Sequence, residues 1–480
     1  MFVHYDSDRR EESCIPLISP PPPCHSERSE EPCIAILIYL SFMTHKLLLF
    51  LLFPLTGFAQ SFSSLLNKET EAAQEQYTQW YQLLHANPEL STQEIKTASF
   101  LKKELRTMGF SIVDSLGFHS FAAVLKNGSG PVLLYRSDMD GLPVKEETGL
   151  SFASKATFKK EGQEIPAMHA CGHDIHMSSW LGTASLMSRL RKQWSGTLIL
   201  LAQSAEETGQ GAKQVVQSPA FRQLPGPDYQ LAFHDHAALP AGQAGFCDGF
   251  SMAAVDMMNI TIYGKGGHGA APHQTIDPVL LAAQYVTAVQ SIVSRNLSPN
   301  DPSVITIGAI HGGTAGNIIP NEVTLKLTIR SYSEATRQLI FDRLKTLGNH
   351  LAAAAGLEKD KMPVYDLLDM SIPSVYNDPA LGKSLRNIIS KEMGEAACTT
   401  VPPVMIGEDF GVYSRQSTAI PSYLLWIGTV APERMAKSTS GKEELYSLHS
   451  SKFAPAHSLT IPAAVKMMSS CLLHLFKTKP

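Results

Sequence analysis

Residues 168–176 read Met-His-Ala-Cys-Gly-His-Asp-Ile-His, a short segment that contains one thiol, three imidazoles and one carboxylate. Side chains of these types are the ligands that proteins use for first-row divalent metals. Cys171 and His173 are two positions apart, so their side chains point the same way if the segment is extended. An ordinary helix or strand has no structural use for so many ligand groups, and the segment therefore indicates a metal site.

The surrounding chain alternates apolar strands with helices. A buried strand at 131–135 ends at Asp138 and Asp140, and another at 197–202 ends at Glu206-Glu207. Polar residues at the ends of strands that alternate with helices predict an α/β sheet with its site on one edge. The same region is expected to contain helices within 65–108 (broken at 87–88), at 174–191 and from 212, and strands at 111–113, 122–125 and 231–233.

The pattern changes near residue 256 to that of a compact α+β unit. This unit is expected to contain strands at 257–263, 303–311, 322–332 and 362–368, and helices at 278–294 and 334–355. The α/β pattern then resumes, with helices at 379–393 and 461–476. We therefore predict a catalytic domain in two parts, 60–254 and 372–480, with the smaller domain inserted at 255–371.

The first 59 residues differ from the rest of the chain. Lys46 precedes nine apolar residues at 47–55, and Gly57-Phe58-Ala59 follows. This pattern is typical of a secretory signal peptide that begins near Met43 and is cleaved after Ala59, and residues before Met43 read as an upstream extension of the reading frame. A membrane anchor is the alternative, but nine apolar residues are too few to span a bilayer. We expect a secreted or periplasmic protein without stable membrane association after cleavage.

Composition limits the other classes of function. A formal net charge of −4 over 480 residues gives no reason to expect nucleic acid as a partner. Seven cysteines over this length do not suggest a disulfide scaffold.

The paired glutamates suggest how a bound metal would be used. Neighbouring side chains at a strand end point in different directions, so one glutamate can bind metal while the other reaches a water molecule. Metal-assisted hydrolysis needs that combination of a Lewis acid and a general base. Candidate residues for such a site are Asp138, Asp140, Cys171, His173, Glu206, Glu207, His234 and His449.

Several separate segments together resemble one enzyme family. The sequence is similar to the dinuclear metal-dependent aminoacylases, a group that includes hippurate hydrolases and auxin–amino acid conjugate hydrolases. The matching segments are 84–90, 136–143, 168–176, 205–207, 264–268 with 272–273, 317–320, 408–410 and 448–450. The resemblance implies a mixed-sheet catalytic domain with helices on both faces, and an inserted α+β domain that serves as a lid and dimerisation domain.

The resemblance also implies roles for individual residues. Its metal ligands correspond to Cys171, His173, Glu207, His234 and His449. Cys171 would bridge two divalent ions (manganese, zinc or cobalt), and Glu206 would be the general base. The family's ligand histidine stands six residues before a Leu-Pro proline, which here is Pro240. That spacing favours His234, and His236 is the competitor.

Four further residues take roles from the same resemblance. Asp140 would orient a ligand histidine. His268 would stabilise the oxyanion from the lid of a partner subunit, which implies a homodimer through the lid. Asn317 and Arg330 are expected to bind the carboxylate of the substrate. Two departures from the family pattern are Ile175, which is expected to narrow the pocket, and Gly407, where the family more often has Ser or Ala.

The predicted activity is hydrolysis of the amide bond of an N-acyl amino acid or a similar small conjugate. Two alternatives belong to other classes. The protein could be a cysteine hydrolase with Cys171 as its nucleophile, or it could be a binding protein for metal or peptide without catalysis. A chelator would inactivate only the metal-dependent enzyme, and thiol alkylation alone would inactivate the cysteine hydrolase.

Overall fold

The computed structural model describes residues 62–160, 162–415 and 420–477. The predicted signal peptide, with its cleavage point after Ala59, lies outside these residues. The largest element is a mixed sheet of eight strands in the order β1-β2-β6-β3-β7-β18-β8-β17. Its strands are β1 Ser111–Val113, β2 Phe121–Asn127, β3 Val132–Asp138, β6 Gly196–Gln203, β7 Tyr229–Pro240, β8 Ala244–Phe246, β17 Cys398–Thr400 and β18 Ser422–Val430.

The centre of this sheet is parallel. β3 runs parallel to β6 and β7, and β7 runs parallel to β18, whereas β2 is antiparallel to β6 and β18 is antiparallel to β8. Carboxyl ends of β3, β6 and β7 therefore meet at one edge, which is where ligand sites form in such sheets. The predicted mixed α/β sheet is confirmed.

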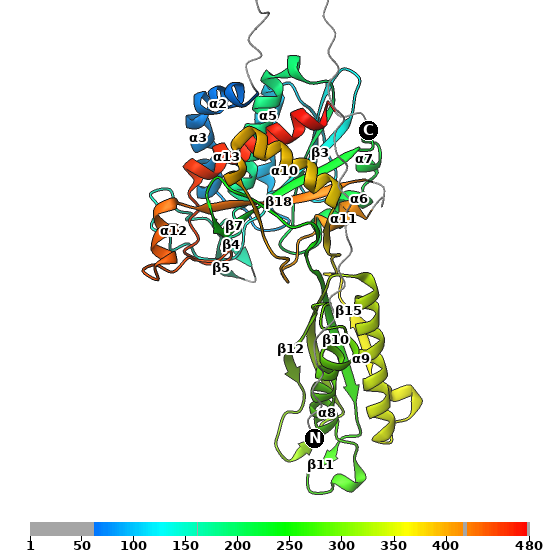
Figure 1. Ribbon diagram of the computed structural model, residues 1–480. Coiled ribbons are helices and arrows are strands. Elements are labelled where there is room, and N and C mark those ends of the chain that lie inside the picture. Colours follow the sequence, from blue (N-terminus) through cyan, green and yellow to red (C-terminus); the bar gives the residue numbers. More distant parts are fainter. Residues whose placement is uncertain (1–61, 161, 416–419, 478–480) are drawn as a thin grey trace, which may run out of the picture. The chain divides into compact units, whose positions relative to one another are not determined.

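Helices cover both faces of the eight-stranded sheet (Figure 1). One side carries α2 Phe62–Ala72, α3 Gln74–Ala86, α4 Ile95–Thr107, α5 His173–Arg189, α10 Pro379–Met393 and α13 His457–Leu475. The other side carries α6 Gly211–Gln217, α7 Pro219–Arg222 and α11 Gly411–Ser414. Nearly all of α5 is buried, because it packs on β3 and β7 and beneath α3, α4 and α13. The start of α5, which contains His173 and directly follows Cys171 and Gly172, is thus fixed in the core.

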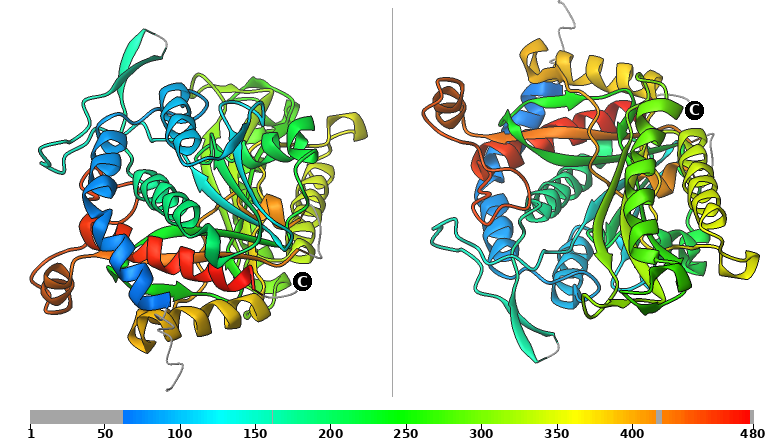
Figure 2. Two further views of the ribbon diagram at one scale, coloured as in Figure 1. Left: turned by 90° about the horizontal axis from the view of Figure 1, so that it is seen from above. Right: turned by 90° about the horizontal axis from the view of Figure 1, so that it is seen from below.

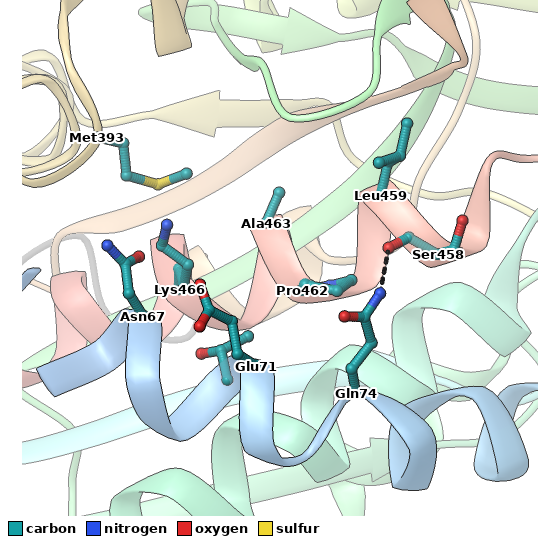
Figure 3. Close-up of a pocket in the computed structure, with 10 residues that line it drawn as sticks. Asn67, Glu71, Gln74, Met393, Ser458, Leu459, Pro462, Ala463 and Lys466 are labelled. Carbon is teal, nitrogen blue, oxygen red and sulfur yellow. Dashed lines mark hydrogen bonds between the residues drawn. The ribbon is translucent and has the colours of Figure 1, made fainter. Parts of the chain in front are cut away.

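Helix α13 is long and apolar enough to cross a membrane, but 67% of it is buried inside the protein. Its packing against α5 and α2 is that of a core helix. It begins at His457 rather than at the predicted Ile461, so Pro462 lies inside the helix. Proline has no N–H to donate to Ser458, and the Gln74 side-chain amide bonds that carbonyl at 3.4 Å instead. A cavity of about 290 Å³ lies beside this proline (Figure 3).

The inserted α+β domain is also present. Its antiparallel sheet has the order β12-β14-β10-β15, and helices α8 and α9 pack on it (Figure 2). The elements are β10 Ala254–Tyr263, α8 Pro278–Ser291, β12 Val304–His311, β14 Glu322–Ser331, α9 Glu334–Ala354 and β15 Val364–Leu367. Strand β14 alternates buried and exposed residues, as expected for a sheet with helices on one face. The predicted boundaries at 255 and 371 stay a prediction.

Some elements were not predicted. All nine residues of β18 are buried, so this strand has no alternation of polar and apolar residues to reveal it. Strand β7 continues through His234 to Pro240 instead of ending at Phe233. The short elements β8, β17, α7 and α11 were not predicted either. The same holds for the hairpin of β4 Thr157–Lys160 and β5 Gln163–Pro166, the pairs β9 Gly249–Met252 with β16 Val375–Asn377 and β11 Gly267–His268 with β13 Ile318–Ile319, and helix α12 Pro432–Thr439.

Candidate metal centre and active site

Five predicted ligand residues meet at one place. The Cys171 sulfur lies 3.5 Å from Nε2 of His234 and 3.3 Å from Nε2 of His449. Glu207 Oε1 lies 3.5 Å from His449 Nε2 and 3.9 Å from His173 Nε2. These residues come from the turn before α5 and its first residue, the turn after β6, the middle of β7 and a loop near the C-terminus. The fold thus gathers side chains that are up to 278 positions apart in the sequence.

The five residues form two overlapping groups. Cys171, His173 and His234 have donor atoms that all lie within 4.8 Å of one another, and so do Cys171, Glu207 and His449. A thiol that belongs to both groups has the position of a bridging ligand. Each group could therefore hold a divalent cation, and Cys171 would be a ligand in both.

The chemistry of these donors fits divalent metal ions. Nε2 of His173 and Oε1 of Glu207 are buried, and neither atom has a hydrogen-bond partner among the described residues. Buried polar atoms are almost always paired, so a buried nitrogen and a buried oxygen that lie near each other without a hydrogen-bond partner fit a bound cation as their common partner. Burial, together with the nearby His176, lowers the pKa of His234 well below its usual value. His234 is thereby kept in the neutral form that binds metal.

His176 connects the elements that carry the ligands. Its Nδ1 donates to Asp138 Oδ1 at 2.6 Å, and its Nε2 forms an ion pair with Asp235. Asp138 ends β3 and Asp235 lies in β7, so this imidazole ties both strands to α5. Gly172 makes the approach of Asp235 feasible, because a Cβ at Gly172 would lie 1.8 Å from an Asp235 carboxylate oxygen. His176 belongs to the Cys/His segment 168–176, but no role was predicted for it from the sequence.

Asp140 contacts two predicted ligand residues. The Nδ1–H of His173 donates to the Asp140 carbonyl at 2.8 Å, which leaves Nε2 facing the other donors. The Asp140 carboxylate accepts hydrogen bonds from Ser91 Oγ at 2.6 Å and from the Glu207 amide at 3.0 Å. Such hydrogen bonds orient the rings and carboxylates that bind metals.

Glu206 lies beside this cluster, with Oε2 at 3.9 Å from His173 Nε2. Burial raises its pKa well above the usual value, and the negative charges of Glu408 and Glu207 add to the shift. Glu408 itself pairs with the buried guanidinium of Arg136 at 3.0 Å, as does Asp409. A carboxylate with a raised pKa can both take up and return a proton near neutral pH.

The predicted lid residues lie apart from the cluster. His268 and Asn317 are exposed neighbours, since Gly269 next to His268 donates to the Asn317 carbonyl at 2.9 Å. Arg330 is half-buried on β14, and burial lowers its pKa. Within the described ranges, no hydrogen bond or ion pair joins these three residues to the five clustered ones.

Three other sequence interpretations can be compared with the structure. His236 is half-buried, accepts a hydrogen bond from the Ala238 amide at 3.2 Å, and is not in the cluster. Ile175 is fully buried in the main hydrophobic core, so the expectation that it narrows the pocket is wrong. Gly407 sits where a Cβ would lie 2.2 Å from Val255, which explains the absence of Ser or Ala there.

Comparison with known proteins identifies the family. Residues 134–450 match the sequence profile of the peptidase family M20/M25/M40. The chain belongs to this family. It is 34% identical over 355 residues to the N-acetylcysteine deacetylase of Bacillus subtilis (strain 168), which covers 73% of this chain and 87% of the relative. It is also 34% identical over 374 residues to the N-acetyldiaminopimelate deacetylase of Ligilactobacillus salivarius (strain UCC118), covering 78% and 90%.

A crystal structure agrees with this assignment. The Bacillus subtilis YXEP protein, a dinuclear metal binding peptidase from the M20 family, superposes with a TM-score of 0.70 and 26% identity. The match covers 85% of this chain and 99% of that one. This M20 protein is therefore a hydrolase that acts on amide bonds, as the resemblance to aminoacylases implied.

Proposed function

We propose that this M20 protein is a metal-dependent amidohydrolase that cleaves the amide bond of N-acyl amino acids or similar small conjugates. The observation that carries the proposal is the meeting of five donor side chains around Cys171, with Glu206 beside them. The two deacetylases named above, both of N-acetylated amino acids, support the class of substrate.

Two divalent ions, either manganese, zinc or cobalt, would be held by Cys171, His173, Glu207, His234 and His449. When bound, such ions polarise the substrate carbonyl and lower the pKa of a water molecule. Glu206 takes the proton from the attacking water and returns it to the leaving amine. Asp140 keeps the ring of His173 and the backbone of Glu207 in place for these steps.

The lid residues complete the site in this proposal. His268 stabilises the oxyanion, and Asn317 and Arg330 bind the carboxylate of the substrate, for which the planar guanidinium is well suited. Since His268 is exposed and no hydrogen bond or ion pair joins it to the ligand residues within the described part of its own chain, we infer that it acts in the site of a second copy. The active form would then be a homodimer. The leader sequence supports a secreted or periplasmic enzyme, whose mature chain would begin at Gln60.

The test is a turnover assay on a panel of N-acyl amino acids, with metal analysis of the purified protein. We expect turnover that a chelator abolishes and that added manganese, zinc or cobalt restores. Activity that survives the chelator but is lost on thiol alkylation would instead identify Cys171 as a nucleophile. Bound metal without turnover of any member of the panel would indicate a binding protein.

A further inference from the structure

The turn that carries the two glutamates has an unfavourable backbone conformation. Ala205, directly before Glu206, has a φ of +57° and is fully buried. A residue with a Cβ is destabilised in this left-handed region and persists there only where its surroundings hold it. The direction of the Glu206 and Glu207 side chains depends on this turn.

Glu94 holds the amide of Ala205, whereas the Ala205 carbonyl accepts hydrogen bonds from the Gly211 amide at 3.0 Å and the Thr208 hydroxyl at 3.3 Å. Oε1 of Glu94 accepts a hydrogen bond from the Ala205 amide at 2.8 Å, and its Oε2 accepts one from the Ser204 hydroxyl. Glu94 is fully buried at the start of α4, 111 positions before Ala205. No cation pairs with it among the described residues. A buried carboxylate without a cation is destabilising in itself, so its bonds to this turn need an explanation.

A second carboxylate holds the other end of the turn. Asp140 accepts a hydrogen bond from the Glu207 amide at 3.0 Å and also contacts His173. The segment 204–207 is therefore fixed by Glu94 before the glutamate pair and by Asp140 within it. Asp140 belongs to the described site, whereas Glu94 bonds neither a ligand side chain nor the base and acts through the Ala205 amide and the Ser204 hydroxyl.

We propose that Glu94 is a positioning residue, whose carboxylate keeps Ala205 in the left-handed conformation and so aims Glu206 and Glu207 at the metal centre. The part that concerns Glu206 rests on the proposed function. The part that concerns Glu207 does not, because metal binding can be measured without turnover.

The experiment compares Glu94→Ala with Glu94→Ala/Ala205→Gly. Without the carboxylate of Glu94, Ala205 can leave the left-handed conformation and displace Glu206. A displacement of about 1 Å can reduce the turnover rate by about 10². We expect Glu94→Ala to lower kcat by about that factor with little change in KM, and to weaken binding of zinc or manganese by about 10–100-fold. Glycine adopts a positive φ without penalty, so the double variant should recover about tenfold of both losses. Glu94→Gln keeps an acceptor oxygen and should lose less than Glu94→Ala.

Glu89 provides a matched control from the same segment. It is a buried carboxylate that accepts hydrogen bonds from the Thr97 amide at 2.8 Å and from the Thr97 hydroxyl at 2.9 Å, without touching residues 204–207. Glu89→Ala should lower the melting temperature but leave kcat and metal affinity of the folded enzyme unchanged. Equal losses in Glu89→Ala and Glu94→Ala, or no recovery with Ala205→Gly, would overturn the proposal. If the wild-type protein cleaves no substrate of the panel, the proposed function fails, and the metal titrations still decide the role of Glu94.

Discussion

The eight-stranded sheet and the inserted domain differ in how their predicted functional residues are arranged and how exposed these residues are. In the first, five candidate ligands from separate segments converge, and carboxylates or carbonyls fix their rings. In the inserted domain, His268 in β11 and Asn317 just before β13 are exposed, and Arg330 on β14 is half-buried. In our proposal the metal centre is built within one chain, whereas a second copy completes the contacts to the substrate. Variants in the two regions should therefore affect different measurable quantities.

Glu206→Gln should give the largest effect. Glutamine cannot accept the proton of the attacking water, so kcat should fall by about 10⁴, the upper end for loss of a general base. The metal content should stay that of the wild type, because Glu206 is not among the five ligands. Glu207→Gln is the matched control and should lose metal as well as activity. Loss of metal from Glu206→Gln would make Glu206 a ligand and remove the base from the mechanism.

His268→Ala should give the next largest effect and tests the lid. Loss of one group that stabilises an oxyanion lowers kcat by about 10², and metal content and melting temperature should not change. Mixing this variant with Glu206→Gln then tests whether the lid serves a second copy. In an equimolar mixture about half of the dimers contain one chain of each variant. One of the two sites in such a dimer combines an intact Glu206 with an intact His268 of the other chain, so about a quarter of wild-type activity should return. A mixture that stays inactive would show that each lid serves its own chain.

A smaller effect is expected from His85, which lies in the catalytic domain but outside the metal cluster. Burial alone would lower its pKa, but the carboxylates of Asp174 and Glu146 at 2.6 and 3.0 Å outweigh burial and raise the pKa to about 10. A raised pKa stabilises the folded state fully below the ordinary value of 6.5, and this contribution is lost as the pH rises towards 10.

The free energy of unfolding, measured by denaturant titration, should therefore decline between pH 7 and 10. His85→Gln should flatten this decline, and His350→Gln, at an exposed position of α9 in the lid, should leave it unchanged. An unaltered pH dependence in His85→Gln would mean that another group causes the decline.

Much of the fold and of the metal centre could be predicted, because both leave a local pattern. Cys171 and His173 stand in one segment of unusual composition, and Glu206 directly follows an apolar strand. The bond between Glu94 and the Ala205 amide leaves no such pattern, because any residue type supplies an amide and the partners are 111 positions apart. Strand β18 was missed for a related reason, since a strand buried on both faces shows no alternation. The role of His176 depends on Asp138 and Asp235, which only the fold brings to its two nitrogens.

The position of β18 beside β7 has a consequence for biosynthesis. Gln230 in β7 and Ser422 in β18 are hydrogen-bonded although 192 residues separate them. A ribosome adding about 5–20 residues per second needs roughly 10–40 s to make that stretch. During this interval the emerging chain has an unpaired strand edge next to a newly made lid. His449, which we propose as a ligand, is translated later still, so in our proposal the nascent protein cannot bind its full complement of metal until translation is almost finished.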